Sequence, residues 1–305
     1  MTFNIETYLD SLLEDIEEIN ISFKGIKYLP DISRFKKLKI LHCDNNNLTS
    51  LPPLNENLEI LFCFSNKITS LPKFNKNLKI LNCCSNQLSF LPLFNEKLKE
   101  IYCCNNELIS LPILNTNLES LFCYNNQLSS LPNLNEKLIN LYCEDNKLYS
   151  LPILNTNLKQ LSCSRNKLIF LPHLNKNLEY LHCSENQLSI LPPLNENLDY
   201  LNCINNQLSY LPFINESLHT IFCLNNPIYE IIQDDNLCIL KKKIIIKILN
   251  KFRYLYYCLK FKKRFRDLLW VRIREPKIRK RYSYEYLIEN LPNEETDLDE
   301  VLNNW

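Results

Sequence analysis

A 20-residue pattern of apolar and polar positions repeats without a break from residue 38 to residue 226 of the chain. One unit reads L-x-x-L-x-C-x-x-N-x-L-x-x-L-P-x-L-N-x-x, as in the stretch that contains Leu121, Cys123, Asn126 and Pro132. Leu121 and Cys123 alternate with outward residues, which predicts a short strand in every unit. A fixed period of this length indicates a solenoid, in which each unit packs against the next.

Ten of the 14 cysteines occupy one column of the repeat. We expect them to fill the core, because buried cysteine behaves as a small apolar side chain. Strands about 4.8 Å apart would also bring neighbouring thiols within reach of a disulfide, whereas a straight column of parallel side chains cannot surround a zinc ion. We favour core packing for Cys43, Cys63, Cys83, Cys103, Cys123, Cys143, Cys163, Cys183, Cys203 and Cys223.

Two columns of asparagine accompany the cysteines. The first, from Asn46 to Asn226, should point inward and pair with the backbone where the chain leaves each strand. The second, from Asn55 to Asn215, marks the return turn. There we expect asparagine to adopt the left-handed backbone conformation, because the chain has only one glycine. Pro52 and its equivalents predict an extended outer side rather than a helical one.

These repeats have the pattern of leucine-rich repeats and resemble the short 20-residue repeats of bacterial effector proteins. In detail the chain is similar to leucine-rich-repeat proteins of giant, mimivirus-like DNA viruses, and its closing residues DLDEVLNNW resemble the tails of other giant-virus proteins. A divergent opening repeat with Ile19 and Ile21 brings the expected number of coils to 11. We therefore expect an α/β repeat solenoid, a horseshoe with a parallel concave sheet, an extended convex side and a C-terminal helical cap.

Four segments are expected along the chain: a capping helix over residues 1–15, the solenoid over 16–232, a basic helical cap over 233–281 and an acidic tail over 282–305. Residues 241–281 hold 17 basic and 2 acidic residues, whereas residues 282–305 hold 7 acidic and none basic. Apolar residues at spacings of 3 and 4 predict a helix from 237 to about 259 that packs on the last coil. A second stripe, with Phe261 and Phe265, continues this helix or starts another. Cys238 and Cys258 should be core thiols of the cap.

The outward strand positions on the concave face are the candidate binding surface, because the fold does not use them. Many are aromatic, and exposed aromatic side chains are common anchors of protein interfaces. Alternatively, the rings only stack between coils and stabilise the sheet. Charged residues on this face are few and mostly acidic, which disfavours nucleic acid there. The candidate residues are Phe62, Phe64, Tyr102, Phe122, Tyr124, Tyr142, Tyr180, Tyr200 and Phe222.

A basic helix face is the second candidate, formed by Lys260, Lys262, Lys263, Arg264 and Arg266. It would bind nucleic acid or an anionic membrane, or it would pair with the acidic tail of the same chain, which we favour slightly. The nearby basic cluster at 277–281 also resembles a nuclear import signal.

Composition argues against most enzyme classes. The chain has 305 residues, 35 basic and 34 acidic, and its single glycine leaves no phosphate-binding loop and no nucleophile elbow. None of the four histidines has both a cysteine or serine nucleophile and an acidic residue placed in adjacent coils, as a catalytic triad would need. The 80 or so residues after the repeats are too few for the ubiquitin-ligase domain of some similar effectors, and neither Cys238 nor Cys258 lies in that domain's C-x-D motif. We expect no catalytic residue, metal, cofactor or small-molecule substrate.

The amino terminus lacks the basic region of a signal peptide, and no apolar run is long enough to span a membrane. A cytoplasmic location, in the host cell for a viral protein, follows as the expectation, and a nuclear or virion location stays open. The function we predict is a non-enzymatic scaffold that binds a protein on its concave face, a viral protein acting on a host protein. The alternative is a structural or tethering protein whose basic helix binds nucleic acid, membrane or a virion component.

Overall fold

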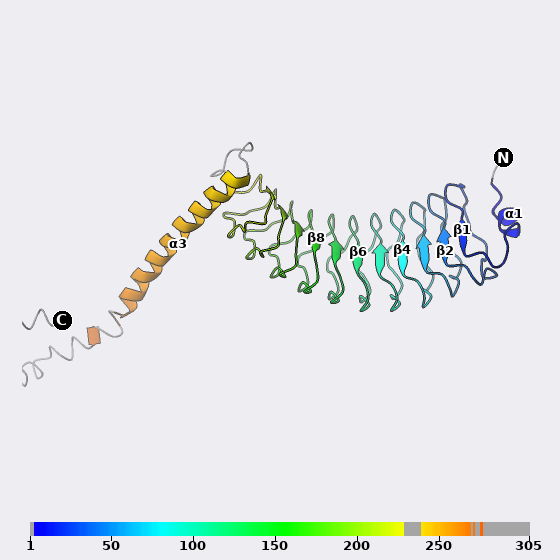
Figure 1. Ribbon diagram of the computed structural model, residues 1–305, viewed down its shortest axis with the longest axis horizontal. Coiled ribbons are helices and arrows are strands. Elements are labelled where there is room, and N and C mark those ends of the chain that lie inside the picture. Colours follow the sequence, from blue (N-terminus) through cyan, green and yellow to red (C-terminus); the bar gives the residue numbers. More distant parts are fainter. Residues whose placement is uncertain (1–2, 229–238, 270, 272–274, 277–305) are drawn as a thin grey trace, which may run out of the picture. The chain divides into compact units, whose positions relative to one another are not determined.

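The computed structural model describes residues 3–228, 239–269, 271, 275 and 276, and it divides the chain into two compact units, Met1–Lys247 and Ile248–Trp305. In the first unit, the described residues form eleven three-residue strands that pair in parallel in chain order (Figure 1). Each strand lies 20 residues from the next, except at the opening pair, so that Leu121 pairs with Ile101 and Leu141. The strands are β1 (Glu18–Asn20), β2 (Ile40–His42), β3 (Ile60–Phe62), β4 (Ile80–Asn82), β5 (Glu100–Tyr102), β6 (Ser120–Phe122), β7 (Asn140–Tyr142), β8 (Gln160–Ser162), β9 (Tyr180–His182), β10 (Tyr200–Asn202) and β11 (Thr220–Phe222).

This parallel solenoid confirms the predicted leucine-rich-repeat fold. The residues between successive strands form turns and extended chain without a helix. The core consists of the inward leucines and the cysteine column, and Leu118, Leu121, Cys123 and Leu128 are completely buried in one coil. All ten column cysteines are buried free thiols, so core packing is confirmed. Burial raises the pKa of the thiols from Cys43 to Cys203, to about 12 for Cys103, which leaves the thiolate scarce at neutral pH.

The first asparagine column forms the predicted ladder. Asn126 Nδ2 donates to the carbonyl oxygens of Cys103 at 3.0 Å and Cys123 at 3.1 Å, and also to Tyr124 at 3.2 Å. Its Oδ1 accepts a hydrogen bond from the Leu108 backbone N–H at 3.0 Å. One amide side chain therefore satisfies buried backbone groups in two neighbouring coils, and the arrangement recurs along the solenoid.

The expected position of the left-handed residues was wrong. Asn55 does not have a positive φ; its Nδ2 donates to the carbonyl oxygens of Ile32 and Phe35, both at 2.9 Å. Positive φ occurs instead directly before each ladder asparagine, where the chain bends sharply out of the strand. Side chains at this bend point outward, so residue type is not restricted to asparagine or glycine, and the ladder hydrogen bonds hold the backbone there. The residues are Asn45, Ser65, Ser85, Asn105, Asn125, Asp145, Arg165, Glu185, Asn205 and Asn225.

The amino-terminal helix α1 (Ile5–Asp10) lies within the expected range 1–15. Asn4 caps it, because its Oδ1 accepts from the backbone N–H groups of Glu6 and Thr7 at 3.0 and 3.1 Å. Ile5 and Leu9 are buried. The helix thus buries an apolar side in the first unit, and its role as a cap stays a prediction.

Helix α3 (Ile239–Leu269) is continuous and runs ten residues past the expected end near residue 259. In its first turns Ile246 is buried and Lys243 Nζ donates to the Glu216 carbonyl oxygen at 2.8 Å. In the second unit, Phe252 is 68% exposed, and Cys258 is exposed rather than a core thiol as expected. Apolar and aromatic residues occur on several sides of this helix, so a single buried stripe does not form. Cys238 and the tail 282–305 lie outside the described residues, and the division into a cap and a tail stays a prediction.

Candidate protein-binding surface

The concave face consists of three outward positions in each coil: the first and third residues of the strand and the residue two beyond its end, such as Ser120, Phe122 and Tyr124. All nine candidate aromatic residues lie at these positions. Eight of them are partly exposed, and Phe222 is 42% exposed. The sheet therefore places the aromatic side chains on one face, accessible to a partner.

The rings form two stacks along the sheet. The ring centroids of Tyr102 and Phe122 are 4.6 Å apart, and those of Phe122 and Tyr142 are 4.8 Å apart, with interplanar angles of 10° and 11°. Tyr180 and Tyr200 form the second stack at 4.5 Å. The stacking expected between coils is thus present, and each ring still leaves part of its surface open.

Not all candidates belong to these stacks. Phe62 contacts the imidazole of His42 at a centroid distance of 5.0 Å, and Asn82 separates it from Tyr102 in the same column. Phe222 lies 6.0 Å from Tyr200 in a tilted arrangement. The aromatic surface is therefore discontinuous, with its broadest part over β5, β6 and β7.

The hydroxyls of two stacked tyrosines hydrogen bond to polar side chains of the same face. The Tyr102 hydroxyl donates to Glu100 Oε2 at 2.8 Å, and burial together with this carboxylate raises the pKa of Tyr102 to about 12. The Tyr142 hydroxyl hydrogen bonds to Gln160 Oε1. These contacts fix the ring orientations, so the edges of both tyrosines stand in set positions for a partner.

Glu144, on the concave face at the position two beyond the end of β7, is a partly buried carboxylate. Burial raises its pKa above the ordinary value, and Asp145 adds to this, while its own backbone N–H and the nearby Ser162 hydroxyl oppose the rise. Its Oε2 atom and the Ser162 Oγ atom are closed to solvent, and neither makes a well-formed hydrogen bond within the described residues. Ser162 itself is 1% exposed.

An ion-pair ladder borders the concave face, at the position three residues beyond each strand end. Arg165 lies 2.9 Å from Glu185 and 3.5 Å from Asp145, on consecutive coils. All three side chains are more than 40% exposed, so we assign the ladder a small contribution to stability.

A disulfide between Cys84 and Cys104 lies on the concave face, and the sequence analysis missed it. Both residues occupy the position two beyond the strand end, in adjacent coils, with a Cα–Cα distance of 4.6 Å. The sequence did contain a signal for this bond: Cys84 and Cys104 lie 20 residues apart and outside the column of inward cysteines. A reducing cytoplasm would hold the pair as thiols.

The described part of the chain brings no three His, Cys, Asp or Glu side chains together as metal ligands. His182 Nε2 lies 2.8 Å from Ser184 Oγ, and burial lowers the pKa of the imidazole. His42 lies 3.5 Å from Glu18, seven coils away from His182. The histidines therefore act singly, in local contacts.

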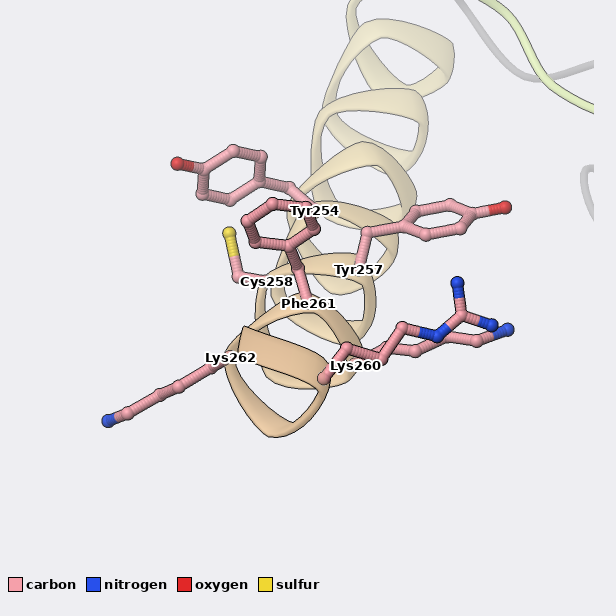
Figure 2. Close-up of a pocket in the computed structure, with 7 residues that line it drawn as sticks. Tyr254, Tyr257, Cys258, Lys260, Phe261 and Lys262 are labelled. Carbon is pink, nitrogen blue, oxygen red and sulfur yellow. The ribbon is translucent and has the colours of Figure 1, made fainter. Parts of the chain in front are cut away.

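The five basic candidates lie on α3 and are all exposed. Three of them, Lys260, Lys262 and Arg264, line a shallow pocket together with aromatic side chains. Tyr254, Cys258 and Phe261 share one side of the helix there, and Lys262 points away from them (Figure 2). Lys260 is engaged in an interaction of its own, so the five do not form a uniformly free cationic face. No helix among the described residues is long and apolar enough to cross a bilayer.

Comparison with known proteins found no matching family model and no matching curated protein. Among solved structures, the chain is similar to YopM from Yersinia enterocolitica, with 34% sequence identity and a TM-score of 0.69 over 73% of this chain and 49% of that chain. The leucine-rich effector YopM from Yersinia pestis is 27% identical, with a TM-score of 0.55 over 73% of this chain and 80% of that chain. The chain thus spans about half the length of the first of these proteins.

A more distant likeness is to an octameric complex of latrophilin 3, Unc5D and the leucine-rich repeats of FLRT2, at 21% identity and a TM-score of 0.61 over 71% of this chain and 77% of that chain. This likeness concerns the fold alone. Together the neighbours show that the solenoid has the leucine-rich-repeat fold, with repeats of about 20 residues in YopM as in this chain.

Proposed function

We propose that the chain is a non-catalytic scaffold that binds a protein partner through the aromatic part of its concave face. The observation that carries this proposal is the stack of Tyr102, Phe122 and Tyr142, which stays partly exposed although it is already packed against its own neighbours. Aromatic side chains held in fixed orientations lose little entropy on binding and bury a large area.

The comparisons support a protein partner. Leucine-rich-repeat neighbours include effectors and a domain found in a complex with other proteins. The resemblance to giant-virus proteins adds the finer proposal that this is a viral protein acting on a host protein in the host cytoplasm. The 20-residue repeats resemble those of bacterial effectors, and this resemblance also supports a role in acting on a host protein.

The test is partner capture in cells with the full chain as bait, compared with a variant in which Phe62, Tyr102, Phe122, Tyr124 and Tyr142 are changed to Ser. We expect the aromatic variant to lose the partner while it keeps its fold, measured by circular dichroism. A matched control changes exposed apolar residues away from the concave face, Phe90, Leu93, Ile113, Ile153 and Phe213, to Ser. A partner that survives the concave-face changes would contradict the proposal.

The second candidate function is tethering through the basic residues of α3. It is supported by the exposure of Lys262, Lys263, Arg264 and Arg266 within two turns of helix. Binding to an anionic partner of this kind weakens steeply with salt, because it releases counterions. A bait without residues 237–305 would lose such a partner, and a salt gradient would elute it from the full chain.

A further inference from the structure

Cys84 and Cys104 take the same concave-face position, two residues beyond the strand end, in the adjacent coils of β4 and β5. Their Cα atoms are 4.6 Å apart, and the two strands pair in parallel with Asn82 opposite Tyr102. The other described strands pair in the same parallel manner without such a bond. The strand pairing therefore holds the two sulfur atoms within bonding reach whether or not the bond is formed.

The two cysteines differ from the thiols of the core column in their access to solvent. Cys83 and Cys103, each one residue before a member of the pair, are completely buried free thiols. Cys84 is partly exposed, whereas Cys104 is only 4% exposed. A dissolved oxidant can therefore reach Cys84 but not the core thiols, and Cys84 is where an exchange reaction would begin.

A backbone donor also favours Cys84 as the attacking group. The Cys104 backbone N–H donates to Cys84 Sγ at 3.2 Å. The Cys84 backbone N–H donates in turn to Asn82 Oδ1 at 3.2 Å, which fixes the chain at this position. A donor aimed at the sulfur stabilises negative charge there, and the thiolate is the form that attacks a disulfide.

We propose that Cys84 and Cys104 form a reversible thiol–disulfide site, which a low-molecular-weight disulfide such as glutathione disulfide oxidises and the corresponding thiol reduces. The Cys84 thiolate attacks one sulfur of glutathione disulfide, a mixed disulfide forms, and the other glutathione leaves as a thiolate. The Cys104 thiolate then attacks Cys84 Sγ and releases the second glutathione thiolate. The two thiol protons of the protein pass to the two released thiolates, so the pair loses two electrons and glutathione disulfide gains them.

The pair lies inside the candidate binding surface. Phe64 precedes it and Tyr124 follows it in the same column, and Tyr102 ends the strand that leads to Cys104. A change between two thiols and a disulfide therefore alters the concave face between its aromatic groups. The reaction itself needs no protein partner, so this inference goes beyond the proposed function, and its test is independent of partner capture.

The test uses the full chain, equilibrated at neutral pH with mixtures of reduced glutathione and glutathione disulfide, then quenched with acid and alkylated in denaturant. Peptide mass spectrometry gives the fraction of chains that carry the Cys84–Cys104 bond. We expect this fraction to rise from about one tenth to about nine tenths as the squared glutathione concentration, divided by that of glutathione disulfide, falls roughly a hundredfold. Excess reduced glutathione should reverse the change, and the column thiols should stay free throughout.

Two variants separate the roles of the two thiols. Cys104→Ser should accumulate a mixed disulfide between Cys84 and glutathione, because the resolving thiol is gone. Cys84→Ser should leave the buried Cys104 unmodified. The matched control is Cys258→Ser, which removes an exposed thiol of α3 and should change the midpoint of the titration less than about twofold.

Three results would overturn the inference. The first is that both thiols of the native chain stay free in excess glutathione disulfide. The second is that the bond, once formed, resists excess reduced glutathione. The third is that the native chain retains glutathione on Cys84 as stably as Cys104→Ser does. Circular dichroism should give the same spectrum for the oxidised and reduced chains, because the strand pairing does not depend on the bond.

Discussion

The Asn126 side chain donates from Nδ2 to the Cys103 carbonyl oxygen at 3.0 Å, across the boundary between two coils. The same amide accepts from the Leu108 N–H, so its removal leaves buried backbone groups unpaired in both coils. We expect Asn126→Ala to lower the free energy of unfolding by about 2 to 4 kcal/mol. Urea denaturation followed by circular dichroism measures this. Gln127→Ala, at the exposed next position, is the control and should cost less than about 0.5 kcal/mol.

The cysteines should differ sharply in reactivity. The ten column thiols are buried and burial raises their pKa where a shift is resolved, so the thiolate that reacts is scarce. We expect iodoacetamide at pH 8 to label Cys258 in the native protein and, after mild reduction, the partly exposed Cys84 as well, but not the buried Cys104. Peptide mass spectrometry assigns each site. Labelling of Cys123 in the folded protein as fast as that of Cys258 would contradict the burial of the column.

Glu144 should make stability fall as pH rises. Its pKa is raised in the folded protein, so the folded state binds the proton more tightly than the unfolded state. Stability from this group is therefore present at low pH and is lost as pH rises through the folded pKa. Glu144→Gln should accordingly be more stable than the native chain at pH 8, with a difference that shrinks below the pKa of an ordinary glutamate. Urea midpoints at several pH values test this, and a variant that is less stable at pH 8 would refute it.

The exposed ladder of Arg165 should matter little to stability. Arg165→Gln removes two ion pairs, but its side chain is 58% exposed and solvent screens both. We expect a change of less than about 1 kcal/mol. A loss as large as that of Asn126→Ala would show that surface charge, rather than the asparagine ladder, holds adjacent coils together.

The periodic residues predicted the fold because each has the same task in every coil. Leu121, Cys123 and Asn126 are buried or hydrogen bonded in the way that their spacing indicates. The left-handed position was misplaced because its side chain points outward and varies, as Ser65 and Arg165 show. A position is therefore visible in the repeat when the core restricts its side chain. A position where only the backbone conformation is fixed is not visible, because its residue type changes from coil to coil.

The candidate site was only partly accessible to sequence reasoning. The aromatic column followed from strand alternation, so Phe122 and Tyr142 could be placed on one face. The buried Oε2 atom of Glu144 and the buried Oγ atom of Ser162 belong to consecutive coils, and the disulfide depends on Cys84 and Cys104 occupying one column in adjacent coils. Such features arise from pairs of coils, and the pattern of a single coil does not contain them.

The central claim is that Phe122, at the middle of the exposed stack, anchors a protein partner. The most direct test is the affinity of the captured partner for Phe122→Ser and for Phe90→Ser, the latter at an exposed phenylalanine away from the concave face. Isothermal calorimetry should give a Kd at least about 30-fold weaker for Phe122→Ser and within about threefold of the native value for Phe90→Ser. Equal affinities of the two variants, with Phe122→Ser still folded, would contradict the account.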